Sequence, residues 1–265
     1  MCLILLAWQV DPAAPLWVAA NRDEFHARPA APLAPWGDGR GGLGVVAGRD
    51  LEAGGTWLGI GGAGRFAAVT NYREADPPAH ARSRGALVQG FLAGDARPGA
   101  YLRAVARNGH RYRGFSLLVG DRDALWLYSN RTGEGPAPLP PGIHGLANVA
   151  MNEPWPKVVH GRAALADTLQ RHRARPAALR AALFGMLRDE RDFQPDALPE
   201  DPRGPEIARR HGRVFIRDPR YGTRASTLVC LAASGHATIH ERTWDGGGRV
   251  RGTRGVATGP RPGSP

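Results

Sequence analysis

MCLILLAW at residues 1–8 and LWVAA at residues 16–20 are two apolar runs that decide the fold of the first part of the chain. Both are rich in residues that favour strands, and the intervening QVDPAAP contains the Asp-Pro pair of a turn. The pattern predicts a β-hairpin. If the turn centres on residues 12–13, the numbers of facing residues sum to about 25, so Cys2 faces Asp23 within two residues either way.

A cluster of four polar residues, NRDE, ends the second predicted strand. Side chains alternate along a strand, so Asn21 and Asp23 share one face while Arg22 and Glu24 share the other. The hairpin brings this cluster beside the start of the chain. Four consecutive polar residues at the end of an apolar strand are unusual and indicate a functional site.

Cys2 has a chemical property that an internal cysteine lacks. If Met1 is removed, the thiol and the free α-amino group belong to the same residue, and Cys2 is small enough for that removal. An α-amine with a pKa of about 7.7–8.0 can accept a thiol proton near neutral pH. Arg22 is expected to lower the thiol pKa, and Asp23 to orient the ammonium group. The alternative is a buried cysteine without a chemical role, as we interpret Cys230 in the apolar TLVCLA.

Composition indicates a globular chain of 265 residues with 42% hydrophobic and 22% charged residues. The formal charge of +11 does not point to nucleic acid, because the arginines are scattered without interleaved aromatic residues. No apolar run approaches the roughly 20 residues of a membrane span. Two distant cysteines without an export signal predict a reducing, cytoplasmic setting.

The order of the predicted elements indicates an α+β fold. Strand patterns such as GFSLLVGD and ALWLYSN come in antiparallel pairs, and IHGLANVAM is expected to pair with these two. The helical patterns at residues 156–171 and 176–188 form a separate block. Residues 1–244 are expected to form a single domain. Residues 245–265 are rich in Gly, Arg and Pro, and are predicted to be a disordered tail.

No cofactor or metal is expected from the sequence motifs. GIGGAG at residues 59–64 has the glycine spacing of a dinucleotide-binding turn, but a strand-like segment follows where that motif needs a helix. We interpret these glycines as a bulge or a close-approach turn. His236 and His240 share a strand face but lie about 13 Å apart, too far to chelate one ion. No other pattern matches a zinc site.

Ten segments in sequence order resemble the NRDE family, also called the transport and Golgi organisation family: MCLILLAW, ANRDEFHARP, AGRDLEAGGTWLGI, RFAAVTNYRE, SRGALV, YRGFSLLVGD, LYSNR, GLANV, PWPKVVHG and YGTRASTLV. The resemblance covers residues 1–242. It implies an N-terminal-nucleophile-hydrolase-like fold, a four-layer αββα sandwich of two antiparallel sheets. It also implies a cysteine hydrolase that cleaves a small, non-peptide amide.

Cysteine hydrolases of that fold, such as choloylglycine hydrolases and penicillin V acylases, use an N-terminal Cys, an Arg and an Asp on the next strand, two Asn and a late Arg. The matching residues implied here are Cys2, Arg22, Asp23, Asn71, Asn148 and Arg224. Here the Arg and the Asp are adjacent, so they cannot both face the thiol without a bulge. Asn21 is the candidate to replace one of them, and Glu24 is a further site candidate.

Each matched residue outside the NRDE segment also has an ordinary structural interpretation. Asn71 either donates its amide to an oxyanion or makes a turn at a strand end, and Asn148 leaves the same choice. Arg224 is either a site cation or a solvated turn residue. Trp57, flanked by glycines, is either core or a platform for a ligand.

The resemblance leaves two classes of function open. The first is hydrolysis of a small amide or acyl substrate through Cys2. The second is a non-catalytic protein that binds and traffics haem or a lipid or acyl thioester. Haem would need a lone axial ligand such as His26, His144 or Tyr221, because no Cys-x-x-Cys-His motif occurs. The sequence sets neither the substrate nor the oligomeric state.

Overall fold

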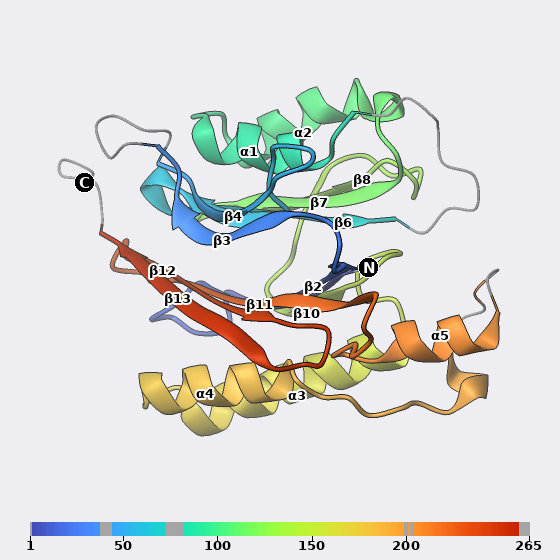
Figure 1. Cartoon of the computed structure of the whole chain (residues 1–265). Helices are drawn as coiled ribbons and strands as arrows, with labels where there is room; N and C mark the ends of the chain where they lie inside the picture. The colour runs from blue at the N-terminus through green and yellow to red at the C-terminus, as the bar shows by residue number, and fades with distance from the viewer. Residues whose placement is uncertain (1, 38–43, 73–81, 199–200, 202–203, 260–265) are drawn as a thin grey trace.

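The computed structural model describes residues 2–37, 44–72, 82–198, 201 and 204–259. Figure 1 shows four layers: a helical pair, a sheet, a second sheet and another helical pair. Every strand pair within the two sheets is antiparallel. The α+β class and the αββα sandwich expected from the sequence are therefore confirmed.

The first sheet carries the N-terminal hairpin near its centre. Its six strands, in spatial order, are β10 (Gly142–Leu146), β1 (Cys2–Trp8), β2 (Leu16–Phe25), β11 (Tyr221–Leu231), β12 (Ala237–Trp244) and β13 (Val250–Thr258). Cys2 pairs with Arg22, one residue from the expected centre and within the predicted margin. The turn between the two apolar runs was thus enough to place the thiol beside the NRDE segment.

The second sheet follows the chain order without a crossover. Its seven strands are β3 (Ala30–Pro35), β4 (Val46–Asp50), β5 (Leu58–Gly61), β6 (Arg65–Asn71), β7 (Phe115–Gly120), β8 (Leu125–Ser129) and β9 (Ala137–Pro138). The last three residues of GIGGAG, Gly62–Gly64, form a short 3₁₀ turn, and β6 follows directly. A Cβ at Gly61 would collide with the backbone carbonyl of Leu92, so the interpretation as a close-approach turn is confirmed.

The outer layers are helical. The helices α1 (Gly85–Ala93) and α2 (Pro98–Ala106) cover the second sheet, whereas α3 (Pro156–His172) and α4 (Pro176–Met186) cover the first (Figure 1). A further helix, α5 (Pro205–Gly212), lies at the end of the first sheet where β2 and β11 meet the site.

Three apolar clusters hold the layers together, and β1 contributes to two of them. Ile4 and Leu6 face the space between the sheets, whereas Leu3 and Leu5 pack against α3 and α4. All seven residues of β1 are buried, because helices cover one face of the strand and the other sheet covers the opposite face. The uninterrupted apolar run of MCLILLAW reflects this burial on both faces.

Two sequence predictions about secondary structure are wrong. IHGLANVAM does not pair with β7 and β8; its β10 portion pairs with β1. Residues 250–258 form β13 instead of a disordered tail, because their backbone pairs with β12 over eight positions. The last part of the predicted tail, residues 260–265, lies outside the described residues.

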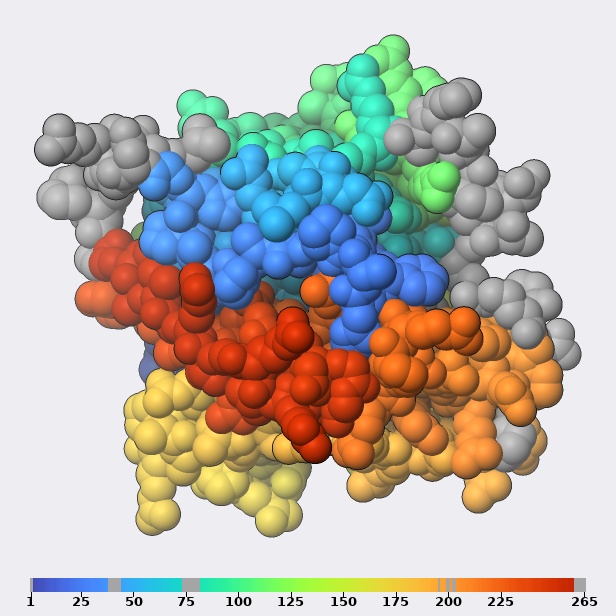
Figure 2. Space-filling view, in the orientation of Figure 1, coloured from blue at the N-terminus to red at the C-terminus, as the bar shows by residue number. Residues whose placement is uncertain are grey.

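The two sheets are joined along one side by β3. The backbone N–H of Leu33 donates to Oε1 of Glu241 at 2.7 Å, and Arg254 donates to the carbonyl of Leu33 at 3.2 Å. Figure 2 shows this contact, with β3 in blue lying against the red β12 and β13. The contact closes one side of the inter-sheet space, beside the site described below.

Candidate functional site

A cavity of about 580 Å³ opens between the two sheets where β1 and β2 meet. This volume lies in the range of small-molecule sites. Seven of the nine residues singled out from the sequence line it: Cys2, Arg22, Asp23, Glu24, Trp57, Asn71 and Arg224. Asn21 and Asn148 do not. The fold thus brings together residues from β1, β2, β6 and β11 that are far apart in the sequence.

Cys2 lies at the start of β1 on the face turned toward the cavity, and only 7% of its surface is exposed. Burial raises the pKa of the thiol, and the Asp23 charge acts in the same direction. The positive charge of the chain's N-terminus, then the Arg22 charge and a backbone hydrogen bond from Asp23, act to lower this pKa, but burial dominates. The expectation of a lowered pKa is therefore wrong for the chain in this form, because desolvation outweighs the nearby cation.

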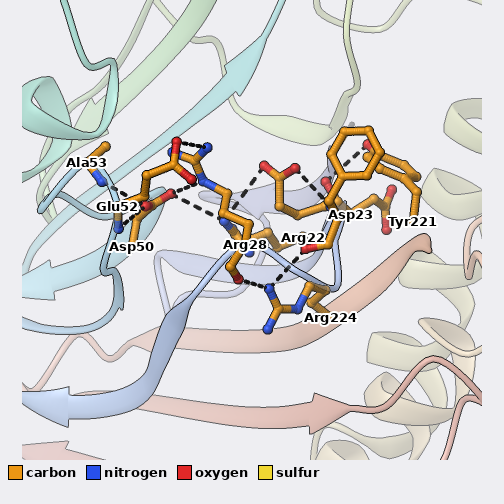
Figure 3. A network of polar contacts seen from close by, with 10 residues as sticks. Arg22, Asp23, Arg28, Asp50, Glu52, Ala53, Tyr221 and Arg224 are labelled. Carbon is orange, nitrogen blue, oxygen red and sulfur yellow. Dashed lines mark hydrogen bonds and ion pairs between the residues drawn. The ribbon is translucent and has the colours of Figure 1, made fainter. Parts of the chain in front are cut away.

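Arg22 lies on the same face as Cys2 and belongs to a chain of ion pairs. Its Nη2 is 3.4 Å from Oδ2 of Asp50 and 3.8 Å from Oε2 of Glu24. Asp50 also accepts a 2.7 Å hydrogen bond from Arg28, which reaches on to Glu52 at 2.9 Å (Figure 3). These contacts fix the Arg22 guanidinium beside the thiol.

Asp50 is the centre of this network. Burial acts to raise its pKa, but the hydrogen bonds from Arg28 and the Ala53 amide, with the Arg28 and Arg22 charges, hold it below the ordinary value. Sequence reasoning missed Asp50 as a site residue. The available signal was its place in AGRDLEAGGTWLGI, where an Asp ends a strand and its side chain binds the following backbone N–H groups, as an Asx turn does.

Asp23 lies on the opposite face of β2 from Arg22, toward the helices, although it also borders the cavity. Its Oδ1 accepts a 2.7 Å hydrogen bond from the Thr223 hydroxyl, and its backbone carbonyl accepts one from Tyr221 at 3.1 Å (Figure 3). Burial raises the pKa of this carboxyl, and the charge of Lys157 is among the influences that oppose the rise. Arg22 is therefore the residue of β2 that pairs with Cys2, whereas the side chain of Asp23 lies on the other face of the sheet.

Asn21 does not replace either neighbour at the thiol. Its Nδ2 donates to the carbonyls of Leu187 and Val214, both at 2.8 Å, and its Oδ1 accepts from the Ser226 hydroxyl at 2.6 Å. These partners lie on the helical side of the first sheet, and Asn21 is fully buried there. Its side chain joins β2 to the segments that follow α4 and α5.

Asn71 and Asn148 have different positions. Asn71 ends β6 with an exposed side chain that lines the cavity from the second sheet. Asn148 is 1% exposed, and its Nδ2 donates to the backbone carbonyl of Asn71 at 2.8 Å. Asn148 thus positions the strand end that carries Asn71, rather than lining the cavity itself.

Arg224 is displaced from the ladder by a β-bulge. The pairing of β11 with β2 shifts between Thr223 and Ala225, so Arg224 has no partner in the register. A bulge redirects a side chain, and here the guanidinium reaches the backbone carbonyls of Phe25 and Arg28 (Figure 3). The bulge that the adjacent Arg and Asp seemed to require thus occurs on β11 and not on β2.

Trp57 and Glu24 complete the wall. Trp57 is partly buried, packs against the inter-sheet core and also lines the cavity; its use as a platform for a ligand stays a prediction. The neighbouring Gly55 lies so close to the backbone of Gly85 that a Cβ would not fit. Glu24 accepts a 2.9 Å hydrogen bond from the Phe25 amide.

Cations outnumber carboxylates around the cavity. Among the residues that the structure describes, its lining contains five acidic ones, namely Asp23, Glu24, Asp50, Glu52 and Glu241. It contains eight arginines, namely Arg22, Arg28, Arg49, Arg82, Arg84, Arg113, Arg224 and Arg251. Burial also raises the pKa of Glu241, as it does that of Asp23. The balance favours a ligand with a negatively charged group.

Candidate ligands for a cofactor are sparse at this cavity. Within the described ranges, none of the three haem-ligand candidates from the sequence, His26, His144 and Tyr221, borders it. The same part of the chain holds no group of three or more His, Cys, Asp or Glu side chains arranged for a metal ion. No helix in the described residues combines the length and apolarity needed to cross a membrane.

A four-layer αββα protein with a cysteine at position 2 beside an inter-sheet cavity is the class that the fold and the site define. The family model "Transport and Golgi organisation 2" matches residues 1–246. The human Transport and Golgi organization protein 2 homolog is 36% identical over 259 residues, 92% of this chain and 93% of the human one. The cattle homolog is 37% identical over 95% of this chain and 96% of its own. The chain belongs to this family.

Two solved structures are also similar. One is an N-acylethanolamine-hydrolyzing acid amidase ortholog from Caenorhabditis elegans, at a TM-score of 0.46 and 10% identity, covering 69% of this chain and 85% of its own. The other is the C2A mutant of a conjugated bile acid hydrolase from Clostridium perfringens, at 0.47 and 11%, covering 97% and 92%. At these scores the likeness carries no argument about activity.

Proposed function

We propose that the chain is a cytoplasmic cysteine hydrolase of the N-terminal-nucleophile type, acting on a small, non-peptide amide after Met1 is removed. The observation that carries this proposal is the position of Cys2. Its side chain lines the cavity at the end of β1, directly opposite Arg22, while Asn71 and Arg224 line the same cavity. A structural cysteine would not need an arginine, an asparagine and a cavity of substrate size beside it.

The proposed reaction uses groups already at this position. The α-amine of the mature chain takes the thiol proton, and the Cys2 sulfur bonds to the carbonyl carbon of the amide. The C–N bond then breaks, and the leaving nitrogen takes the proton from the α-ammonium group. Water then attacks the thioester carbon while the α-amine takes one of its protons. The C–S bond breaks, the acyl group leaves as the acid with the hydroxyl from water, and the proton passes from the α-ammonium group to the sulfur. Asn71 is suited to donate its amide to the oxyanion formed in both steps.

Removal of Met1 is part of this mechanism because it changes the electrostatics of the thiol. Burial raises the thiol pKa, and this disfavours the thiolate that catalysis needs. A base on the same residue overcomes this by taking the proton as the bond to carbon forms. Arg22, held by Asp50, then stabilises the negative charge on sulfur.

The test is turnover of a panel of acyl amides and acyl-homoserine lactones by the wild type and by Cys2→Ala. Loss of the nucleophile should lower the rate by several orders of magnitude while the fold is retained. Asn71→Ala should lower kcat by roughly 10²–10³-fold. Cys230→Ala, which removes the other cysteine and lies outside the cavity lining, serves as the matched control and should retain most of the activity. Equal rates for the wild type and Cys2→Ala would refute the hydrolase.

A non-catalytic role in binding haem or an acyl thioester is the second candidate. The observation that favours it is the burial of Cys2, which disfavours its thiolate, in a cavity rich in arginine. Both ligands carry negatively charged groups that such a wall could bind. Under this alternative the wild type has no turnover and binds the ligand as tightly as Cys2→Ala does. Haem binding of micromolar affinity together with complete inertness toward amides would establish it over the hydrolase.

A further inference from the structure

His144 is a buried histidine of β10 that the proposed reaction does not use. It pairs with Leu6 of β1 on the face turned toward the second sheet, and 7% of its surface is exposed. Its ring is hydrogen-bonded at both nitrogens. Nε2 lies 2.8 Å from the carbonyl oxygen of Pro140, and Nδ1 lies 3.0 Å from Nδ2 of Asn152. A histidine held on both sides in this way requires one particular protonation state.

The two partners require the neutral ring with its proton on Nε2. The Pro140 carbonyl only accepts, so Nε2 carries the hydrogen, whereas the Asn152 side-chain nitrogen only donates, so Nδ1 carries the lone pair. A second contact sets the orientation of the Asn152 amide, because its Oδ1 accepts a 3.0 Å hydrogen bond from the Gly145 N–H. A proton on Nδ1 would therefore place a donor against a donor. Turning the amide over would only move the conflict to Gly145.

Asn152 closes the loop that follows β10. Its backbone N–H donates to the Gly145 carbonyl at 2.8 Å, so its main chain and side chain together hold both backbone polar groups of Gly145. Its φ of 60° lies in the left-handed region, which asparagine tolerates better than most residues. Leu146 and Met151 form a bridge just inside this closure. The loop at residues 147–150 is thus fixed at its base by Asn152.

The same loop reaches across to the second sheet. Asn148 donates through Nδ2 to the backbone carbonyl of Asn71, and the Val149 carbonyl accepts a 3.4 Å hydrogen bond from the Ser116 hydroxyl of β7. The Oδ1 atom of Asn148 is buried without a hydrogen-bond partner in the described part of the chain. One hydrogen bond therefore holds this side chain, and its position depends on the loop. The closure at Asn152 thereby affects the strand end from which Asn71 lines the cavity.

We propose that His144 and Asn152 are positioning residues for Asn71 in the proposed site. Their hydrogen bond keeps the loop at residues 147–150 in place, and protonation of His144 releases it. This role rests on the proposed function, because Asn71 is the oxyanion donor of that reaction. Within the described ranges neither residue lines the cavity, so both act through Asn148. The site is assembled when His144 is neutral and loosened when it is charged.

The electrostatics of His144 agree with this arrangement. Burial lowers the pKa of the ring, the Pro140 hydrogen bond acts to raise it, and the Arg162 charge lowers it further. Arg162 is the charged group of α3 that acts on the ring, and its Nε donates to the Ile143 carbonyl at 3.0 Å. Leu6 lies beside the ring on β1, and no carboxylate of the described residues is among the groups that act on this pKa. The stability that the neutral ring contributes is complete above its ordinary pKa of about 6.5. It is lost as the pH falls through the lowered pKa of the folded state.

Nitrogen NMR of the histidine rings and of the asparagine side chains is the first experiment. The signals of His144 and Asn148 are identified by their absence in His144→Gln and Asn148→Asp. Near neutral pH the His144 ring should show its proton on Nε2. As acid protonates the ring, the Asn148 amide signal should change with the same midpoint. In His144→Gln that change should disappear, whereas it should persist in the matched control His160→Gln, whose ring contacts Asp189 instead of the loop.

Asn152→Asp gives an independent test that does not need His144→Gln to fold. The carboxylate can still accept from the Gly145 N–H, but it now presents an acceptor to Nδ1, which suits the charged ring. The His144 pKa should therefore rise by about one unit or more, a tenfold change in proton affinity. The loop should then be held when the ring is charged and loosened when it is neutral, the reverse of the wild type. An Asn148 signal that ignores the titration of His144, or an Asn152→Asp variant that keeps the wild-type pH response, overturns the proposal.

A kinetic measurement separates this proposal from the proposed function. Below the His144 pKa, kcat of the wild type should fall about tenfold per pH unit more steeply than that of His144→Gln, because one further proton is bound. An active enzyme in which Asn148 ignores His144 would overturn the positioning role alone. An inert wild type in which Asn148 follows His144 would refute the hydrolase and leave the control of the loop by His144 in place.

Discussion

Replacing Asn21 with alanine should destabilise the fold by about 3–6 kcal/mol without altering the cavity wall. The substitution leaves two buried carbonyls, of Leu187 and Val214, and the Ser226 hydroxyl without the partner that Asn21 supplies. Each unsatisfied buried group costs about 1–3 kcal/mol, and water entering the vacated space recovers part of the total. A typical domain has only about 5–15 kcal/mol of stability, so the loss would be large.

Urea unfolding of the wild type and Asn21→Ala measures this difference, read from the midpoint at an unchanged m value. Asn71→Ala is the matched control, because its side chain is exposed and should change stability by less than about 0.5 kcal/mol. The two variants should therefore separate, one losing stability and the other losing function. A loss of under 1 kcal/mol for Asn21→Ala would refute the structural role assigned to Asn21.

Two other predictions follow from the same network and from the mature N-terminus. Intact-mass measurement of the purified protein should show that Met1 is absent, and a mass that retains it removes the free-amine mechanism. Asp50→Asn should destabilise the protein by about 1 kcal/mol at pH 7, because the folded-state pKa of Asp50 lies below its unfolded value of about 3.9. That contribution is present above the unfolded pKa and lost as pH falls through the folded pKa. The stabilities of the wild type and Asp50→Asn, measured by urea unfolding, should thus converge as the pH falls below the ordinary carboxyl range; a constant gap would contradict the assignment.

Much of the fold followed from the sequence, because local signals determined it. The turn between two apolar runs set the hairpin register to within one residue, which was enough to bring Cys2 to the NRDE segment. Strand β13 escaped prediction because its residues bury almost nothing, and its order comes from backbone pairing with β12. Composition indicates how much apolar surface a segment can bury. It does not indicate whether the segment can pair with the free edge of a neighbouring strand, as β13 does with β12.

The site was harder to predict than the fold, for geometric reasons. A shift of one residue in register decides whether Arg22 or Asp23 faces the thiol, and no local signal has that precision. The bulge at Arg224 arises from the pairing of β11 with β2, some 200 residues away in sequence. Asp50 lies in a segment that the sequence singled out, yet its role depends on contacts with Arg22 and Arg28 that form only after the sheets have packed.

Trapping of an acyl-enzyme tests the central claim most directly. The wild type is mixed with a reactive acyl amide, quenched in acid, and examined by intact-mass measurement followed by peptide mapping. The account predicts a mass increase equal to the acyl group, located on an N-terminal peptide that begins at Cys2, and absent from Cys2→Ala. Cys230, whose pKa burial raises to about 12, serves as the internal control and should remain unmodified. A chain that turns over the amide without any adduct on Cys2, or that carries the acyl group on Cys230 instead, would contradict the assignment of Cys2 as the nucleophile.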